Sequence, residues 1–163
     1  MEHQAFAQLL GSYGEFFGAF AVVVTLGYLA AQIRQNNQIS RFGTARDIFY
    51  KFDTLNDRLV ADPELRAALL TRDALTEEQE DILYSWANSW ANTWIICQAA
   101  HDNGLIDDGV FLTAKEDVSV ENKRWRNFKP FLIRFLDNFP EFRDYDIFND
   151  LNKERKEENE VVS

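Results

Sequence analysis

The chain of 163 residues has no formally charged residue between Glu15 and Arg34. A helix rises about 1.5 Å per residue, so this apolar run covers most of a hydrocarbon core about 30 Å thick. We therefore expect residues 16–34 to form one transmembrane helix. The preceding residues, 1–15, are predicted to be a short extracytoplasmic or interfacial arm.

Two other kinds of segment also contain long apolar runs. A helix in the core of a large soluble protein can be apolar on every side, but this chain is long enough for only one modest domain. A cleaved signal peptide opens with basic residues and ends in small residues, whereas the first basic residue here is Arg34 and Leu29–Ala31 matches a cleavage site poorly. A retained anchor is the favoured interpretation, and both alternatives stay open.

Lysine and arginine are absent from the first 33 residues. Arg34, Arg41, Arg46 and Lys51 follow the apolar run closely. Because positive charge is retained on the cytoplasmic side of a membrane, this asymmetry predicts an external N-terminus and a cytoplasmic domain from residue 35 onward.

Residues with the usual catalytic and metal-binding chemistry are scarce. Cys97 is the single cysteine, so no intramolecular disulfide can form, and His101 has no second histidine or cysteine near it. The chain has no nucleophile motif and no glycine-rich phosphate loop. We therefore expect no enzyme, no catalytic residue, no metal and no cofactor. The net charge of −10 argues against nucleic acid as a partner.

Strand signals are absent as well, and the pattern predicts an all-α fold. A long N-terminal helix should run through the apolar segment and end at Asp62 and Pro63, which start the next helix. The rest, residues 35–152, should form a cytoplasmic bundle of about five helices. Its helices are expected at 63–71, from Thr76 to Asn103, at 109–118, from Ser119 or Glu121 onward, and at 140–151.

Local signals set several of these boundaries. Thr76 and Gln79 have the spacing of a capping box, and Gly104 suits a left-handed C-cap. Asp107 or Asp108 should start the helix that follows. The last segment, residues 153–163, is rich in charge and is predicted to be a flexible tail.

A repeated SWAN motif places Trp86, Trp90 and Trp94 one helical turn apart, with Asn88 and Asn92 on a neighbouring face. One interpretation is an aromatic face that binds a hydrophobic molecule, with the two amides as polar contacts. The favoured interpretation is that the three indoles are core, because aromatic stripes at helical spacing usually are.

Small residues form two pairs in and beside the apolar run. Gly14 and Gly18 are four residues apart, as are Gly27 and Ala31, and such pairs let two helix backbones approach closely in lipid. Alternatively, these residues reflect only the frequency of glycine and alanine in membrane helices.

One basic island interrupts the acidic domain. Lys123, Arg124, Arg126 and Lys129 lie within seven residues and could contact lipid headgroups or an acidic partner. The favoured interpretation is a solvated surface whose cations pair with nearby acids.

Residues 14–38, GEFFGAFAVVVTLGYLAAQIRQNNQ, resemble the opening of an uncharacterised family of small bacterial single-span membrane proteins. Later segments are similar to the same family at 62–65, 104–107, 125–126 and 139–145, although only the first motif is specific. The resemblance implies a helical protein anchored in the bacterial inner membrane, and it implies no activity.

Together these observations predict a membrane-anchored structural or interaction protein, a scaffold or accessory subunit that associates with itself or with another membrane protein. The alternative is a ligand-binding sensor that uses the tryptophan face.

Overall fold

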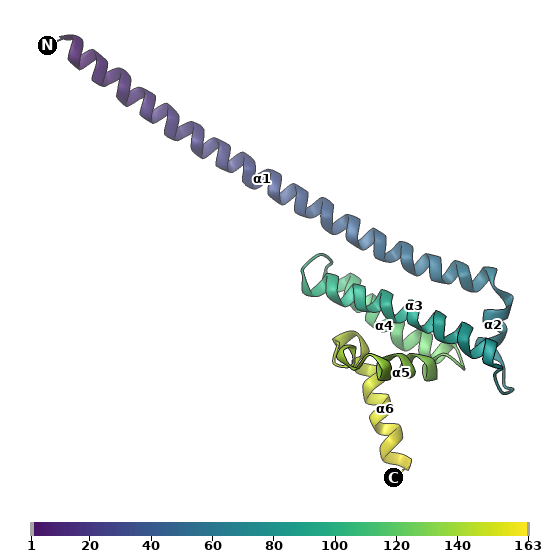
Figure 1. Cartoon of the computed structure of the whole chain (residues 1–163). Coiled ribbons are helices and arrows are strands. Elements are labelled where there is room, and N and C mark those ends of the chain that lie inside the picture. The colour runs from purple at the N-terminus through teal and green to yellow at the C-terminus, as the bar shows by residue number, and fades with distance from the viewer. Residues whose placement is uncertain (1, 163) are drawn as a thin grey trace. The chain divides into compact units, whose positions relative to one another are not determined.

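The computed structural model describes the backbone of residues 2–162 and the side-chain surroundings of residues 11 and 13–156. Most of the predicted N-terminal arm and the end of the charged tail lie outside the described side chains. The chain divides into two compact units, Met1–Ser40 and Arg41–Ser163. Every regular element in the described backbone is helical, so the predicted all-α fold is confirmed (Figure 1). The elements in chain order are α1 (Glu2–Ala61), α2 (Pro63–Leu70), α3 (Glu77–Asp102), α4 (Asp108–Arg124), α5 (Lys129–Asn138), the 3₁₀ turns η1 (Pro140–Phe142) and η2 (Asp146–Phe148), and α6 (Asn149–Val162).

The predicted long helix that ends before Pro63 is α1. It holds no proline, and the following Pro63 disfavours a helical conformation at Asp62, so α1 stops at Ala61. In the first unit the large apolar side chains from Tyr13 to Ile33 are 46% to 66% exposed. In the second unit α1 is amphipathic, since Ile48, Leu55 and Leu59 are buried in the helical core. One helix therefore supplies the apolar run and one wall of the second unit.

The predicted caps of α2 and α3 are confirmed. The Asp62 carboxylate accepts a 3.0 Å hydrogen bond from the Leu65 amide, and Pro63 occupies the first turn, where its missing N–H is not needed. Thr76 and Gln79 form the reciprocal capping box at the start of α3, with distances of 3.3 and 3.1 Å.

Gly104 ends α3 in the left-handed region, with φ of +65°. Its amide donates to the His101 carbonyl, and the Leu105 amide donates to the Ala100 carbonyl, both at 2.8 Å. These two bonds define a Schellman motif, which satisfies carbonyls that the helix end would otherwise leave unpaired. The predicted glycine C-cap is confirmed.

The predicted break after Val118 is wrong, because α4 continues from Asp108 to Arg124. Asp107 caps this helix by accepting a 2.9 Å bond from the Val110 amide. Neither Ser119 nor Glu121 starts a helix. The physical reason is that the buried face of α4 runs unbroken through the expected boundary, at helical spacing: Phe111, Ala114, Val118 and Glu121.

The actual break lies between Arg124 and Lys129. Pro130 occupies the first turn of α5, where a residue without an amide proton is tolerated. Asn127 fills the gap by donating from Nδ2 to the Ala68 carbonyl (2.8 Å) and the Thr71 carbonyl (3.0 Å), while its backbone amide donates to the Leu69 carbonyl (3.2 Å). This loop therefore satisfies the free carbonyls at the C-terminal end of α2.

The helix predicted at 140–151 is also wrong. Two 3₁₀ turns, η1 and η2, replace it, and an extended backbone at Tyr145 separates them. The Ile147 amide donates to Gln98 Oε1 of α3 at 3.1 Å, so a tertiary hydrogen bond replaces a helical one there. The final helix starts at Asn149, and the charged segment predicted as a flexible tail has a helical backbone to Val162.

The two glycines Gly104 and Gly43 should respond oppositely to alanine. Gly104→Ala should lower the free energy of unfolding by about 1 kcal/mol, because a Cβ atom is strained at positive φ. Gly43→Ala should raise it by roughly 0.5–1 kcal/mol, because Gly43 is helical and an added Cβ meets no atom within 4 Å.

Denaturant unfolding of the full chain in non-ionic detergent, followed by tryptophan fluorescence, measures both changes. Equal effects of the two substitutions would contradict the role assigned to the left-handed cap.

Candidate functional site

Three indoles form the centre of the second unit. Trp86, Trp90 and Trp94 on α3 are 0% to 1% exposed. The ring centroids of Trp86 and Trp90 lie 5.7 Å apart, and those of Trp90 and Trp94 lie 5.3 Å apart. Phe52 of α1 packs on Trp90 at 5.6 Å, and Phe128 contacts Trp86 at 5.0 Å. The tryptophan stripe is therefore hydrophobic core.

The polar atoms of this stripe are only partly satisfied. Trp94 Nε1 donates to Asp117 Oδ2 at 3.2 Å, whereas Nε1 of Trp86 and of Trp90 has no hydrogen-bond partner among the described residues. Asn92 is exposed, and Asn88 is half-buried with its Oδ1 atom unpartnered in the same description. The two amides thus do not join the indoles in one open face.

One of the three indoles borders a surface groove. Trp90 lies in the wall of a cavity of about 330 Å³ between α1, α3 and α4 of the second unit. Apolar side chains predominate in it, and Asp117 and Glu116 add negative charge. The lining residues are Phe49, Phe52, Asn56, Trp90, Thr113, Ala114, Glu116, Asp117 and Val120.

The Asp117 carboxyl in this groove has a raised pKa. Burial raises its pKa to about 6, because a charged carboxylate loses hydration there. The hydrogen bond from Trp94 and the nearby Arg124 favour the charged form, while the neighbouring Glu121 opposes it. This carboxyl therefore changes its charge close to neutral pH.

Two other residues singled out by the sequence are structural. Cys97 is fully buried one turn after Trp94, as expected of a small apolar residue. His101 stacks on Phe111 with a ring-centroid distance of 4.2 Å, and its Nε2 lies 3.0 Å from Asp108 Oδ1. Within the described residues, no three His, Cys, Asp or Glu side chains are grouped to hold a metal ion.

Two of the four cations of the basic island, Arg124 and Lys129, pair with acids. Arg124 lies 3.4 Å from Glu121 and stacks over the Trp125 ring, and Glu121 also accepts a hydrogen bond from Trp125 Nε1. Lys129 pairs with Glu154 at 3.2 Å. Lys123 and Arg126 are exposed.

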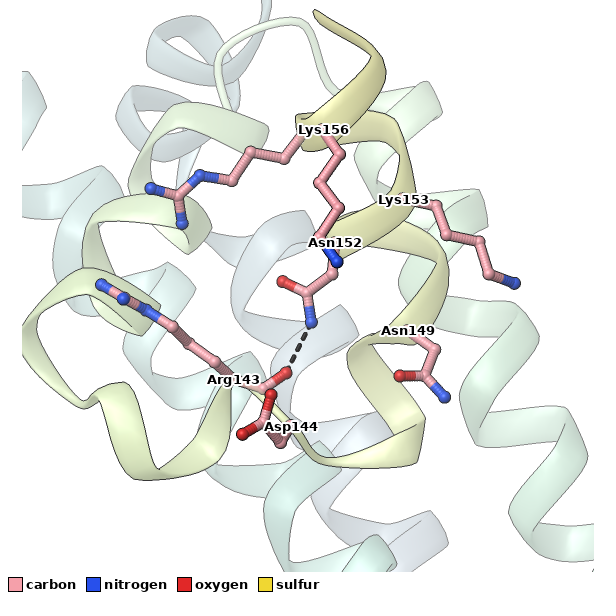
Figure 2. Close-up of a pocket in the computed structure, with 7 residues that line it drawn as sticks. Arg143, Asp144, Asn149, Asn152, Lys153 and Lys156 are labelled. Atoms are coloured by element: carbon pink, nitrogen blue, oxygen red, sulfur yellow. Dashed lines mark hydrogen bonds between the residues drawn. The ribbon is translucent and has the colours of Figure 1, made fainter. Parts of the chain in front are cut away.

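A second basic site, which no local sequence motif marks, lies where η1, η2 and α6 meet (Figure 2). It is a hollow of about 600 Å³, and its described lining has four cationic side chains and one acid. Spacing along α6 is the signal that could have indicated it, since Asn149, Asn152, Lys153 and Lys156 follow an i, i+3, i+4, i+7 pattern. We call this the basic hollow; it is lined by Arg143, Asp144, Asn149, Asn152, Lys153, Arg155 and Lys156.

In the first unit the small residues face open space. A Cβ atom added at Gly14, Gly18 or Gly27 meets no other atom within 4 Å. Among the searched residues, one helix is long enough and apolar enough to span a membrane, and that helix is α1. The hydroxyl of Thr25 inside this run donates to the Ala21 carbonyl at 2.8 Å, so it is not left unpaired.

The raised pKa of Asp117 makes stability depend on pH. The folded state holds this proton more tightly than the unfolded state, so the free energy of unfolding falls as the pH rises from about 4 to 6. Asp117→Asn should remove that loss, because an amide oxygen still accepts from Trp94 Nε1. We expect the variant to be more stable than wild type by about 2 kcal/mol at pH 7, and by much less at pH 4.

Urea unfolding at pH 4, 5, 6 and 7 measures the difference. The adjacent exposed acid supplies the control, since Glu116→Gln removes a similar charge without the buried hydrogen bond. A constant gap between wild type and Asp117→Asn across this range would contradict the assignment.

Comparison with known proteins adds no relative from which a function could be transferred. No protein-family model, curated protein or solved structure matches this chain. The resemblance of residues 14–38 therefore stays a prediction, and function is inferred from the residues of the chain itself.

Proposed function

We propose that the protein is a membrane-anchored interaction protein, a scaffold or accessory subunit held at a membrane by α1. The observation that carries this proposal is the exposed apolar surface of the helix. Its large side chains from Tyr13 to Ile33 are 46% to 66% exposed, and no charge lies between Glu15 and Arg34. In water such a surface is unfavourable, whereas in lipid it is solvated by hydrocarbon.

The helical backbone suits a bilayer as well. Every peptide group inside a regular helix is bonded within its own segment, so the run leaves no unpaired backbone group in hydrocarbon. The absence of lysine and arginine before Arg34 supports an external N-terminus and a cytoplasmic second unit. The membrane in this proposal is the bacterial inner membrane, as the resemblance of residues 14–38 implies.

Self-association is part of the proposal. The open positions Gly14 and Gly18, and Gly27 with Ala31, are the small-residue pairs that allow close helix contact in lipid. In the second unit Phe42 and Phe49 are 73% and 45% exposed, and could be covered by a second copy. Phe52, three residues after Phe49 on the same helix, packs on Trp90.

A second candidate function rests on the groove beside Trp90. Its wall combines Phe49, Phe52 and Val120 with the titrating Asp117, which suits an apolar molecule that also carries a polar group. This replaces the predicted three-indole face by a site in which only Trp90 takes part.

The membrane anchor predicts firm retention. The full chain should pellet with membranes and resist both high salt and carbonate, because ions do not screen apolar burial. The double substitution Val23→Arg and Leu26→Arg should release the chain from the membrane fraction, because inserting each arginine at the centre of a span costs roughly 2.5–3.5 kcal/mol.

Val120→Arg is the matched control, because Val120 is an exposed apolar residue outside the run. Protease added to intact spheroplasts should leave residues 35–163 intact and degrade them only after lysis. Wild-type protein in the soluble fraction, or digestion before lysis, would contradict the anchor or its orientation respectively.

Self-association is tested by enlarging the small residues. Gly18 and Gly27 are nine residues apart and lie about 180° around the helix from each other, so a two-helix contact uses one of them. Either Gly18→Leu or Gly27→Leu should therefore weaken crosslinking in membranes about tenfold, and the other substitution serves as its control.

The circular dichroism of both variants should match that of wild type. A wild-type chain that stays monomeric at all concentrations would exclude self-association.

A further inference from the structure

The basic hollow concentrates positive charge in a chain whose net charge is −10. Among the described residues, its lining brings Arg143, Lys153, Arg155 and Lys156 together with one acid, Asp144. Two acids beside the hollow neutralise part of this charge, because Asp137 pairs with both arginines and Asp150 pairs with Lys153 at 3.1 Å. The remaining charge of these described residues is positive.

The two arginines are held next to each other by one carboxylate oxygen. Asp137 Oδ1 lies 2.7 Å from Arg143 Nη2 and 3.0 Å from Arg155 Nη1. Arg143 is fixed further by its Nε, which donates to the Leu136 carbonyl at 3.0 Å. One negative charge thus orders two guanidinium groups, and most of their other N–H groups have no acceptor among the described residues.

The α6 side of the hollow adds a third cation. Figure 2 shows the Lys156 side chain extending toward Asn152, one turn earlier, while Lys153 points away from Arg143. Asn152 Nδ2 donates to the Arg143 carbonyl, which ties α6 to the loop that carries Arg143. Lys129 of α5 also pairs with Glu154 of α6 at 3.2 Å. A hydrogen bond and an ion pair therefore hold together the elements that carry these cations.

We propose that the basic hollow is a binding site for a phosphate-bearing anion, held by Arg143, Arg155 and Lys156. Guanidinium groups match the paired oxygens of a phosphate, and an ammonium group adds a compact charge. The volume of about 600 Å³ leaves room for several phosphates or for a phosphorylated organic group. Its source is a soluble polyphosphate compound or a phospholipid headgroup. The site does not depend on the proposed membrane anchor.

Calorimetric titration of the full chain in non-ionic detergent micelles tests the site. One arm uses inorganic tripolyphosphate, and the other uses dioctanoyl phosphatidic acid, a lipid with a phosphomonoester headgroup. We expect wild type to bind at least one probe, with affinity falling as salt is raised. Lys156→Gln and Arg155→Gln should each weaken binding about tenfold, because each removes one charge-assisted contact.

Lys51→Gln is the matched control, since Lys51 is an exposed lysine on α1 of the same unit. It should bind as wild type does, and circular dichroism should confirm that every variant is folded. Binding of tripolyphosphate alone identifies a soluble ligand, and binding of phosphatidic acid identifies a headgroup. No heat with either probe at millimolar concentration, or equal weakening by Lys51→Gln and Lys156→Gln, would overturn the proposal.

Discussion

The fold of the second unit depends on enclosing three indole rings that lie on successive turns of one helix. Trp86, Trp90 and Trp94 cannot be covered by α3 itself, so each ring requires contact from another element. Phe52 of α1 covers Trp90, while Phe128 before α5 contacts both Trp86 and Trp94. Aromatic rings bury large areas and prefer inclined contacts, and here those contacts position the neighbouring elements around α3.

Polar contacts then decide where the chain turns around this aromatic centre. The Asn127 side chain donates a hydrogen bond to a carbonyl at the C-terminal end of α2. Inside the core, Gln98 Oε1 accepts a hydrogen bond from the Ile147 amide. Each of these bonds replaces a backbone bond that a continuous helix would have made. These hydrogen bonds therefore fix the conformation of the irregular segments, because burying a peptide group without a partner costs free energy.

The predictable parts of the fold are those specified by neighbouring residues. Asp62, Thr76 and Gly104 act within their own turns, so their caps follow from short patterns. The helix break predicted at Ser119 is wrong because a serine can also lie inside a helix. Only the buried stripe of α4 shows that the helix continues through this residue. Pro130 was the better local signal for the next helix start.

The candidate sites follow the same division between local and tertiary information. Helical spacing predicts the tryptophan stripe. It does not predict that Asp117, 23 residues after Trp94, accepts a hydrogen bond from the Trp94 indole N–H. The basic hollow joins Arg143 from a loop to Arg155 and Lys156 in a run that also contains glutamates. In the linear sequence those opposite charges suggest a flexible tail, and only the three-dimensional arrangement shows that Arg143 and Arg155 share the Asp137 carboxylate.

The burial of Cys97 gives this chain a chemical probe of its own motions. Thiols react as thiolates, and burial both covers this sulfur and raises its pKa to about 11. An alkylating reagent therefore reaches Cys97 only when the region around α3 opens, at a rate set by the population of the open form. Since no other cysteine competes for the reagent, mass spectrometry of a single adduct would follow the transient opening of the tryptophan core in the full chain.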